Sequence, residues 1–147
     1  MQIEKLADPD SEIQKFLWAQ LQSYSLSRLQ PVGSMERTES FCLLVKDGEK
    51  VIAGTICYVF FQGLNLQLLW VAEEERGKDL GTLLLRRVEE EAVSCGANLV
   101  FGYSFGFQAP RFYLKMGYEQ VGLIEDYPAG HNCYFLCKKL PSSSESL

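Results

Sequence analysis

The stretch "ERGKDLGTLLLRRVEEEA", residues 75–92, leads a charged loop with two glycines directly into an amphipathic helix. Such a loop forms an anion site, because free backbone N–H groups and the helix dipole favour negative charge at the same place. Arg76 and Lys78 add two cations to the loop. These residues therefore predict a site for phosphate groups, with an ordinary helix start and solvated charges as the alternative.

The composition of the chain limits its partners. It has 147 residues, of which 47% are hydrophobic, enough for one domain with one core. A formal net charge of −5 disfavours nucleic acid and membrane surfaces, since both select clustered Lys and Arg. No run reaches the roughly 18 uninterrupted apolar residues of a membrane-spanning helix, and the chain does not open with a positively charged start followed by an apolar run. We expect a cytoplasmic protein with a single domain at residues 1–140 and a polar, disordered tail at 141–147.

The cysteines predict no metal site. Their number is odd, and none of them forms a C-x-x-C pair. A catalytic cysteine would need the only histidine, His131, as its partner, and nothing in the sequence brings the two together. We expect no metal, and thiols that are mostly buried in a reducing compartment. The cysteines are Cys42, Cys57, Cys95, Cys133 and Cys137.

Hydrophobic periodicity and turn residues predict the helices and strands that position these groups. Apolar spacing predicts a first helix within residues 8–24, with Ser11 and Gln14 as a capping box. Residues 27–40 are expected to be irregular, and the Asp-Gly turn at 47–48 predicts a hairpin that opens a meander. The predicted strands are 41–45, 50–62, 64–71, 98–105, 118–125 and 132–140, and the later helices are 80–95 and 110–116.

The helix at 80–95 joins two strands and so forms a βαβ crossover. Strands joined in this way run parallel, whereas the strands of the meander should be antiparallel neighbours. Pro110 suits the first turn of the short helix, and Gly117 suits its end. The order of elements predicts an α/β fold of the α+β type.

Two stretches on these elements resemble the GNAT family of N-acetyltransferases, which take an acetyl group from acetyl-CoA. "RGKDLG", residues 76–81, is similar to the family's pyrophosphate loop, which has an Arg or Gln, two residues, Gly, one residue, and Gly or Ala. "FYLKMGYE", residues 112–119, resembles the family's helix and turn with a central tyrosine. The likeness covers roughly residues 50–140. It implies a GNAT fold, a mixed and mostly antiparallel twisted sheet of roughly six to seven strands flanked by about four helices.

The resemblance also assigns residues to acetyl-CoA. It implies that the backbone N–H groups of residues 77–82 hold the pyrophosphate, and that N–H groups near Trp70 and Val71 stabilise the oxyanion. The family usually has Gly at the position of Asp79, whose side chain we expect to turn outward. Gln108 is a substitute for the family's usual Asn. The residues implied to bind acetyl-CoA are Trp70, Val71, Arg76, Gly77, Lys78, Asp79, Leu80, Gly81, Thr82 and Gln108.

The same resemblance implies a general acid. Tyr113 matches the family's proton donor to the leaving thiolate, and the alternative is a core aromatic residue. The strand before the loop offers only Asn65 and Gln67 where many relatives have a glutamate base. Glu125 is therefore the candidate base or substrate contact, because relatives bound the acceptor pocket at this place. The other implied substrate residues are Asp126, Tyr127 and His131.

Together these residues imply an acetyl-CoA-dependent N-acetyltransferase. We expect direct attack by the primary amine of a small, cationic molecule rather than an acetyl-enzyme. The alternatives are a protein or peptide amine acetyltransferase, a CoA-binding module without catalysis, and a small α/β protein that binds another phosphorylated ligand. The expected partner is the amine substrate, and a homodimer stays open.

Overall fold

The computed structural model of the chain describes residues 1–29 and 38–141 and contains two compact units, Met1–Glu36 and Arg37–Leu147. Most of the irregular segment predicted at 27–40, and all but the first residue of the predicted tail, lie outside the described residues. The single domain expected at residues 1–140 stays a prediction. No helix in the two described ranges is long and apolar enough to cross a membrane.

In the described part of the first unit there is one helix, α1 (Ser11–Arg28), as the apolar spacing predicts. Its N-cap is Asp10, whose carboxylate accepts a hydrogen bond from Ile13 N at 2.9 Å. The predicted capping box at Ser11 is therefore wrong, and the Gln14 side chain instead donates to a backbone carbonyl before the helix at 3.0 Å. The cap lies one residue earlier because Asp10 keeps the extended backbone of an N-cap and offers a charged acceptor.

The second unit begins with an antiparallel meander of three strands, β1 (Glu39–Asp47), β2 (Lys50–Phe60) and β3 (Gly63–Val71). The predicted Asp-Gly hairpin is confirmed, since Asp47 pairs with Lys50 across the turn and Gly48 has a φ of +59°. Glycine adopts this left-handed angle without the strain that a Cβ would cause.

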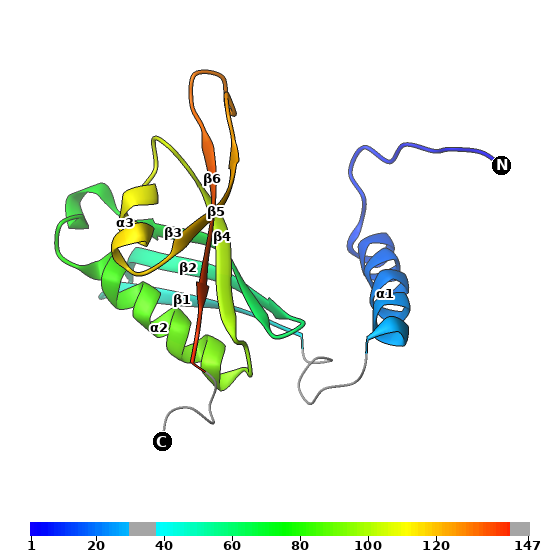
Figure 1. The fold of residues 1–147 in the computed structure, drawn as a ribbon, viewed down its shortest axis with the longest axis horizontal. Helices are drawn as coiled ribbons and strands as arrows, with labels where there is room; N and C mark the ends of the chain where they lie inside the picture. Colours follow the sequence, from blue (N-terminus) through cyan, green and yellow to red (C-terminus); the bar gives the residue numbers. More distant parts are fainter. Residues whose placement is uncertain (30–37, 142–147) are drawn as a thin grey trace. The chain divides into compact units, whose positions relative to one another are not determined.

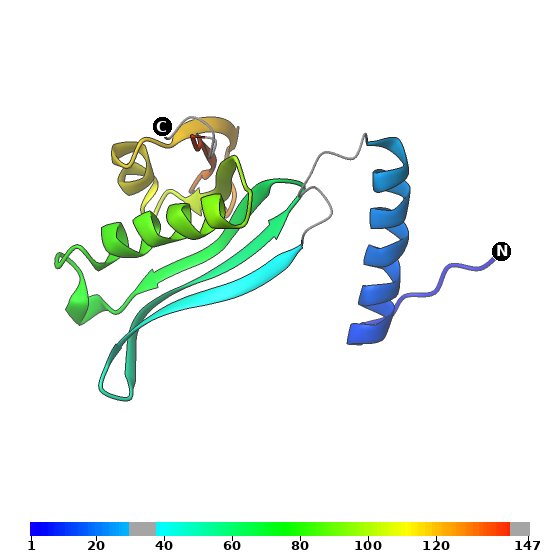
Figure 2. The same ribbon diagram turned by 90° about the horizontal axis from the view of Figure 1, so that it is seen from below.

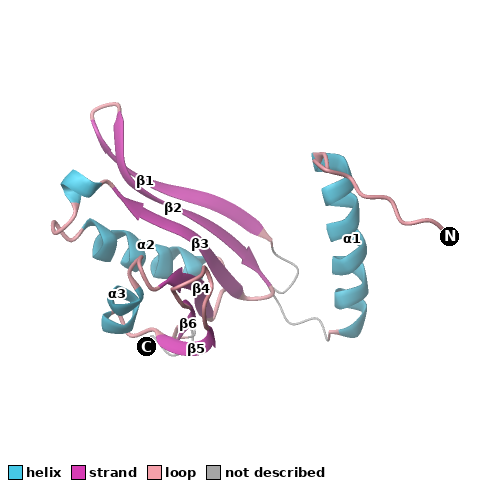
Figure 3. Ribbon diagram, turned by 90° about the horizontal axis from the view of Figure 1, so that it is seen from above, coloured by secondary structure: helices cyan, strands magenta, loops and turns pink. Residues whose placement is uncertain are grey.

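A crossover helix joins the meander to the rest of the sheet. The helix α2 (Leu80–Ser94) leads to β4 (Leu99–Phe105), which pairs with β3 in parallel as predicted. This parallel ladder is short, because it joins only residues 63–65 to residues 99–101. Beyond it β3 and β4 run in different directions, so the sheet opens between them (Figures 1 and 3).

The other half of the sheet contains β4, β5 (Glu119–Ile124) and β6 (Cys133–Lys139), which pair antiparallel in the order β4-β6-β5. The short helix α3 (Pro110–Lys115) lies between β4 and β5 in the sequence. Pro110 is in its first turn, and Gly117 follows its end with a φ of +90°, as predicted. A six-stranded, mostly antiparallel sheet with three α-helices in the described residues confirms the predicted fold class.

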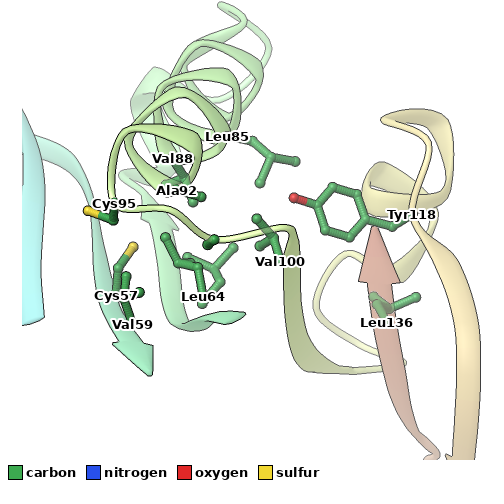
Figure 4. Packing of buried hydrophobic residues seen from close by; sticks show 12 residues of the cluster. Cys57, Val59, Leu64, Leu85, Val88, Ala92, Cys95, Val100, Tyr118 and Leu136 are labelled. Carbon is green, nitrogen blue, oxygen red and sulfur yellow. The ribbon is translucent and has the colours of Figure 1, made fainter. Parts of the chain in front are cut away.

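The hydrophobic core of the second unit lies between α2 and the sheet (Figures 2 and 4). One face of α2 supplies Leu85, Val88 and Ala92, which are fully buried together with Leu64 of β3 and Val100 of β4. These positions follow the helical spacing of the sequence. The packing fixes the direction of α2, and with it the place where the charged loop enters the helix.

Candidate active site

The loop between β3 and α2 contains two residues with left-handed backbone angles. It begins with a short 3-10 turn, η2 (Glu73–Glu75), and then passes through Gly77 at a φ of +77° and Asp79 at a φ of +61°. A left-handed angle explains why glycine suits the position of Asp79, and Asp is one of the few other residues that tolerate it. The Asp79 side chain makes no capping hydrogen bond, so it leaves the N–H groups of the first turn free.

The backbone N–H groups of this loop are available to a ligand. Arg76 N donates to Glu73 O, and Leu83 N donates to Asp79 O. Between these two, the N–H groups of residues 77–82 donate to no acceptor in the part of the chain that the structure describes. Several free donors at the N-terminus of a 15-residue helix suit an anion, as expected from the sequence, and the binding of phosphate groups here stays a prediction.

Two lysines near the loop pair with carboxylates of η2. Lys78 Nζ donates to Glu75 Oε2 at 2.8 Å, and Lys50 Nζ on β2 donates to Glu74 Oε1 at 2.9 Å. This second hydrogen bond raises the pKa of Lys50 and lowers the pKa of Glu74. Two of the three carboxylates of η2 are therefore neutralised by lysines, which reduces their repulsion of a bound anion.

The backbone of β3 faces the opening of the sheet at Val71. Ala72 N donates to Ile52 O of β2 at 2.8 Å, and N–H groups alternate sides along a strand. Trp70 N–H therefore faces β2, whereas Val71 N–H faces the side where β4 has separated. Val71 O accepts a hydrogen bond from Arg76 Nε at 3.3 Å, which holds Arg76 beside the same edge. Of the two predicted oxyanion donors, only Val71 presents its N–H to the opening.

Tyr113 lies on α3 and is half-buried. Burial raises the pKa of its hydroxyl to about 12, so the group keeps its proton at neutral pH and is able to donate it. The neighbouring Phe112 packs against the first turn of α2, where a Cβ added to Gly81 would lie 3.4 Å from its Cζ atom. Gly81 therefore allows α3 to approach α2 closely, a role that the loop motif alone does not predict.

A small cavity lies beside Tyr113. Its volume of about 10 Å³ is enough for one water molecule. It lies next to the end of the β3–β4 ladder and is lined by Leu66, Val100, Phe101, Gly102, Tyr103, Tyr113, Tyr118 and Leu136.

Gln108 has a structural contact of its own. Its side-chain oxygen accepts a hydrogen bond from Phe105 N at 2.8 Å, and its backbone N–H donates to Phe105 O at 2.9 Å. These two bonds close the turn that follows β4. Its contact with acetyl-CoA stays a prediction.

The predicted acceptor residues lie on the loop between β5 and β6. Asp126 Oδ1 accepts a hydrogen bond from Gly130 N at 2.7 Å, and Tyr127 N donates to His131 O at 2.8 Å. These bonds bring Tyr127 and His131 to the same end of a compact loop. The role of Glu125 as base or substrate contact rests on the sequence and stays a prediction.

Two aromatic residues that the sequence analysis missed complete this loop. Phe105 contacts the Tyr127 ring edge-on at 5.5 Å between centroids, and Phe107 contacts the His131 ring edge-on at 4.9 Å. Phe105 and Phe107 are stacked on each other at 5.5 Å. The sequence signal that could have indicated them is the aromatic residue at every second position from residue 103 to 107.

Comparisons with known proteins identify the family and the fold. The model of the acetyltransferase (GNAT) family matches residues 2–118. The blasticidin-S acetyltransferase of Streptomyces morookaense is 36% identical over 94 residues, which are 62% of this chain and 68% of that protein. An acetyltransferase of Agrobacterium fabrum is 26% identical over 130 residues, which are 88% of this chain and 93% of that protein. The crystal structure of an acetyltransferase from Bacillus cereus has a TM-score of 0.81 and 32% identity, and the match covers 93% of this chain and 98% of that one.

The matched residues include the loop before α2 and the helix of Tyr113, the two stretches that carry the resemblance in the sequence. The family model covers more than half of the chain, and the Bacillus cereus structure matches over almost its whole length. The assignment therefore does not depend on two short motifs, and the chain belongs to the GNAT family of acetyltransferases.

Proposed function

We propose that this acetyltransferase transfers the acetyl group of acetyl-CoA to the primary amine of a small, cationic molecule by direct attack. The observation that carries this proposal is the 36% identity to an enzyme named for a small-molecule acceptor, the blasticidin-S acetyltransferase. The net charge of −5 supports a cationic acceptor, because it favours the approach of positive ligands.

GNAT enzymes use acetyl-CoA as their cosubstrate, and the residues present here fit it. The free N–H groups of residues 77–82 would hold the pyrophosphate at the start of α2. Gly77 has no protein atom within 4 Å of where its Cβ would be, so the loop has room for a ligand. Arg76 would add positive charge beside Val71. Acetyl-CoA, when bound, supplies an activated acetyl group.

The residues around the opening of the sheet would support the transfer. Val71 N–H would donate to the oxygen on which negative charge develops, and a donor placed for this charge is one of the larger contributions to catalysis. The Tyr113 hydroxyl would donate a proton to the leaving sulfur. Burial raises the pKa of Cys57 to about 11, so this core thiol stays protonated at neutral pH and is a poor nucleophile.

The acceptor amine must lose a proton before it attacks. A primary amine with a pKa of about 10.4 is almost fully protonated at neutral pH, so a base is required. We assign this role to Glu125, with Asp126, Tyr127 and His131 as further contacts to the acceptor. The carboxylates and the exposed aromatic rings of this loop both favour a cation.

The decisive experiment measures CoA release from acetyl-CoA across a panel of amines, with calorimetry for acetyl-CoA binding. The panel contains blasticidin S, polyamines, amino sugars and peptides with free N-termini or lysines. We expect turnover with a small cationic amine. Turnover with peptides alone would contradict the substrate class. Tight acetyl-CoA binding without turnover on any amine would instead indicate a binding module, and no binding at millimolar acetyl-CoA would refute the whole proposal.

A further inference from the structure

Lys138 of β6 joins three elements through its ammonium group. It donates to Glu89 Oε1 of α2 and to the backbone oxygen of Met116, which follows α3, both at 2.9 Å. Only 28% of the Lys138 side chain and 16% of the Glu89 side chain are exposed. Pairs this far removed from water are screened less than the exposed pairs on the outer face of α2. Breaking one partner leaves the other charge unpaired, so the pair should act as a firm link.

Lys138 binds the C-terminal end of α3, the helix that contains Tyr113. Tyr118 N donates to Tyr113 O at 3.0 Å, and Gly117 N donates to Leu114 O at 3.2 Å. With Gly117 at a φ of +90°, these bonds form a Schellman motif. The two carbonyls after Leu114, those of Lys115 and Met116, accept no bond within the helix, so Met116 O needs a partner outside it. Lys138 supplies that partner, and a cation at a helix C-terminus is favoured by the helix dipole.

The ring of Tyr118 connects Lys138 to Tyr113. Tyr118 is 4% exposed and belongs to the core between α2 and the sheet (Figure 4). Its ring meets the Tyr113 ring edge-on at 5.7 Å between centroids, which is the apolar contact that usually accompanies a Schellman motif. Lys138 Nζ lies 5.7 Å from the centroid of the same Tyr118 ring. Burial, and then the nearby carboxylate of Glu89, raise the pKa of the Tyr118 hydroxyl, so Tyr118 also lies beside the partner of Lys138.

We propose that Lys138, held by Glu89, is a positioning residue for Tyr113. A helix of six residues has little stability of its own, so its direction depends on what holds its two ends. At one end of α3, Phe112 packs on Gly81 near the start of α2. At the other end, Lys138 links the last turn of α3 to Glu89 in the middle of α2. The inference rests on the proposed function in one respect, the role of Tyr113 as proton donor.

The first test replaces Lys138 with methionine, which keeps most of the side-chain length and removes the charge. Lys138→Arg is the conservative variant, because a guanidinium can donate to both oxygens. Arg87→Met is the matched control, since it breaks a pair on the same helix, at 2.7 Å from Glu91, in which the arginine is exposed. We expect Lys138→Met to lower kcat about tenfold while the acetyl-CoA dissociation constant changes less than about threefold. Lys138→Arg should recover most of this loss, and Arg87→Met should resemble the wild type.

A second readout does not require turnover. Amide hydrogen exchange reports the opening of individual hydrogen bonds, including those of Gly117 and Tyr118 in the Schellman motif. We expect exchange at these two amides to rise at least about tenfold in Lys138→Met, with the amides of α2 unchanged and Arg87→Met without effect. Glu89→Gln should produce the same pattern more weakly. It also gives an independent measurement if Lys138→Met does not fold.

A double-mutant cycle separates positioning from a general loss of stability. In the Tyr113→Phe background no proton donor remains to be positioned, so Lys138→Met should lower kcat no further. Additive losses, or a kcat within about twofold of wild type with unchanged exchange at Gly117 and Tyr118, would overturn the inference. If the wild type itself acetylates no amine, the proposed function fails. The exchange data then decide alone whether Lys138 holds the end of α3.

Discussion

The carboxylate of Asp79 should weaken acetyl-CoA binding without contributing to the loop. Its side chain makes no capping bond, and its backbone has a φ of +61° at the N-terminus of α2. At about 8 Å in a water-like dielectric, one charge repels another by about 0.5 kcal/mol, which gives about 1 kcal/mol for the two charges of a pyrophosphate. We therefore expect Asp79→Asn to bind acetyl-CoA about fivefold more tightly at low salt.

A second variant separates the charge from the backbone angle. Asp79→Gly removes the same charge and also relieves a left-handed strain of about 1 kcal/mol. Glycine also lowers stability by a similar amount, because it gives the unfolded chain more conformational freedom. The two effects oppose each other, so the free energy of unfolding should change by less than about 1 kcal/mol. Both variants should gain affinity equally, and the gain should shrink with added salt.

Calorimetric titration at two salt concentrations and urea unfolding measure the two quantities. Glu119→Gln, at an exposed position on β5, controls for the change in net charge alone. A tenfold loss of affinity in Asp79→Asn would show that the carboxylate organises the loop or binds the ligand through a cation. The argument from repulsion would then be wrong.

The other predictions concern α3 and the cosubstrate. Tyr113→Phe should lower kcat about 10- to 100-fold in steady-state assays and leave acetyl-CoA affinity unchanged in calorimetry. Burial raises the Tyr113 pKa from 10.0 to about 12, so with rising pH the unfolded chain loses this proton at a lower pH than the folded protein. The free energy of unfolding should therefore fall as the pH rises from about 10 to 12. Urea unfolding should show a smaller alkaline loss in Tyr113→Phe. Gly81→Val should lower the melting temperature, since its side chain would push Phe112 away. Acetyl-CoA at about 100 times its dissociation constant should stabilise the wild type by about 2.7 kcal/mol in thermal unfolding.

Features that depend on neighbouring residues were predicted from the sequence. The Asp-Gly hairpin at 47–48, the crossover through α2 and the limits of α3 at Pro110 and Gly117 all follow from local turn chemistry and periodicity. One local error is the strand predicted at 50–62, which ends at Phe60 because Phe61 and Gln62 have left-handed φ angles and form the turn to β3. The other is the cap of α1. Asp10 and Ser11 are adjacent and both suit an N-cap, so composition cannot choose between them.

Features that depend on distant residues were not predicted. Lys138 and Glu89 are 49 positions apart, and each has the composition of an ordinary surface residue. The packing of Phe112 on Gly81 and the direction of Val71 N–H depend on how α2, α3 and the strands are arranged, which no short pattern encodes. The loop before α2 is the exception, because its free N–H groups belong to one continuous segment and follow from the sequence. Its binding of phosphate stays a prediction.

The opening of the sheet explains why these distant contacts matter for function. The β3–β4 ladder ends at residues 65 and 101, so no backbone hydrogen bonds between β3 and β4 hold Val71 and Tyr113 at a fixed separation. That separation depends instead on side chains between α2 and α3, chiefly Phe112 against Gly81 and Lys138 between Glu89 and Met116. Side-chain contacts yield to substitution more easily than a continuous ladder does. Substitutions far from the reacting atoms should therefore change kcat more than they change acetyl-CoA affinity, because the proposed anion site lies within one loop at the start of α2.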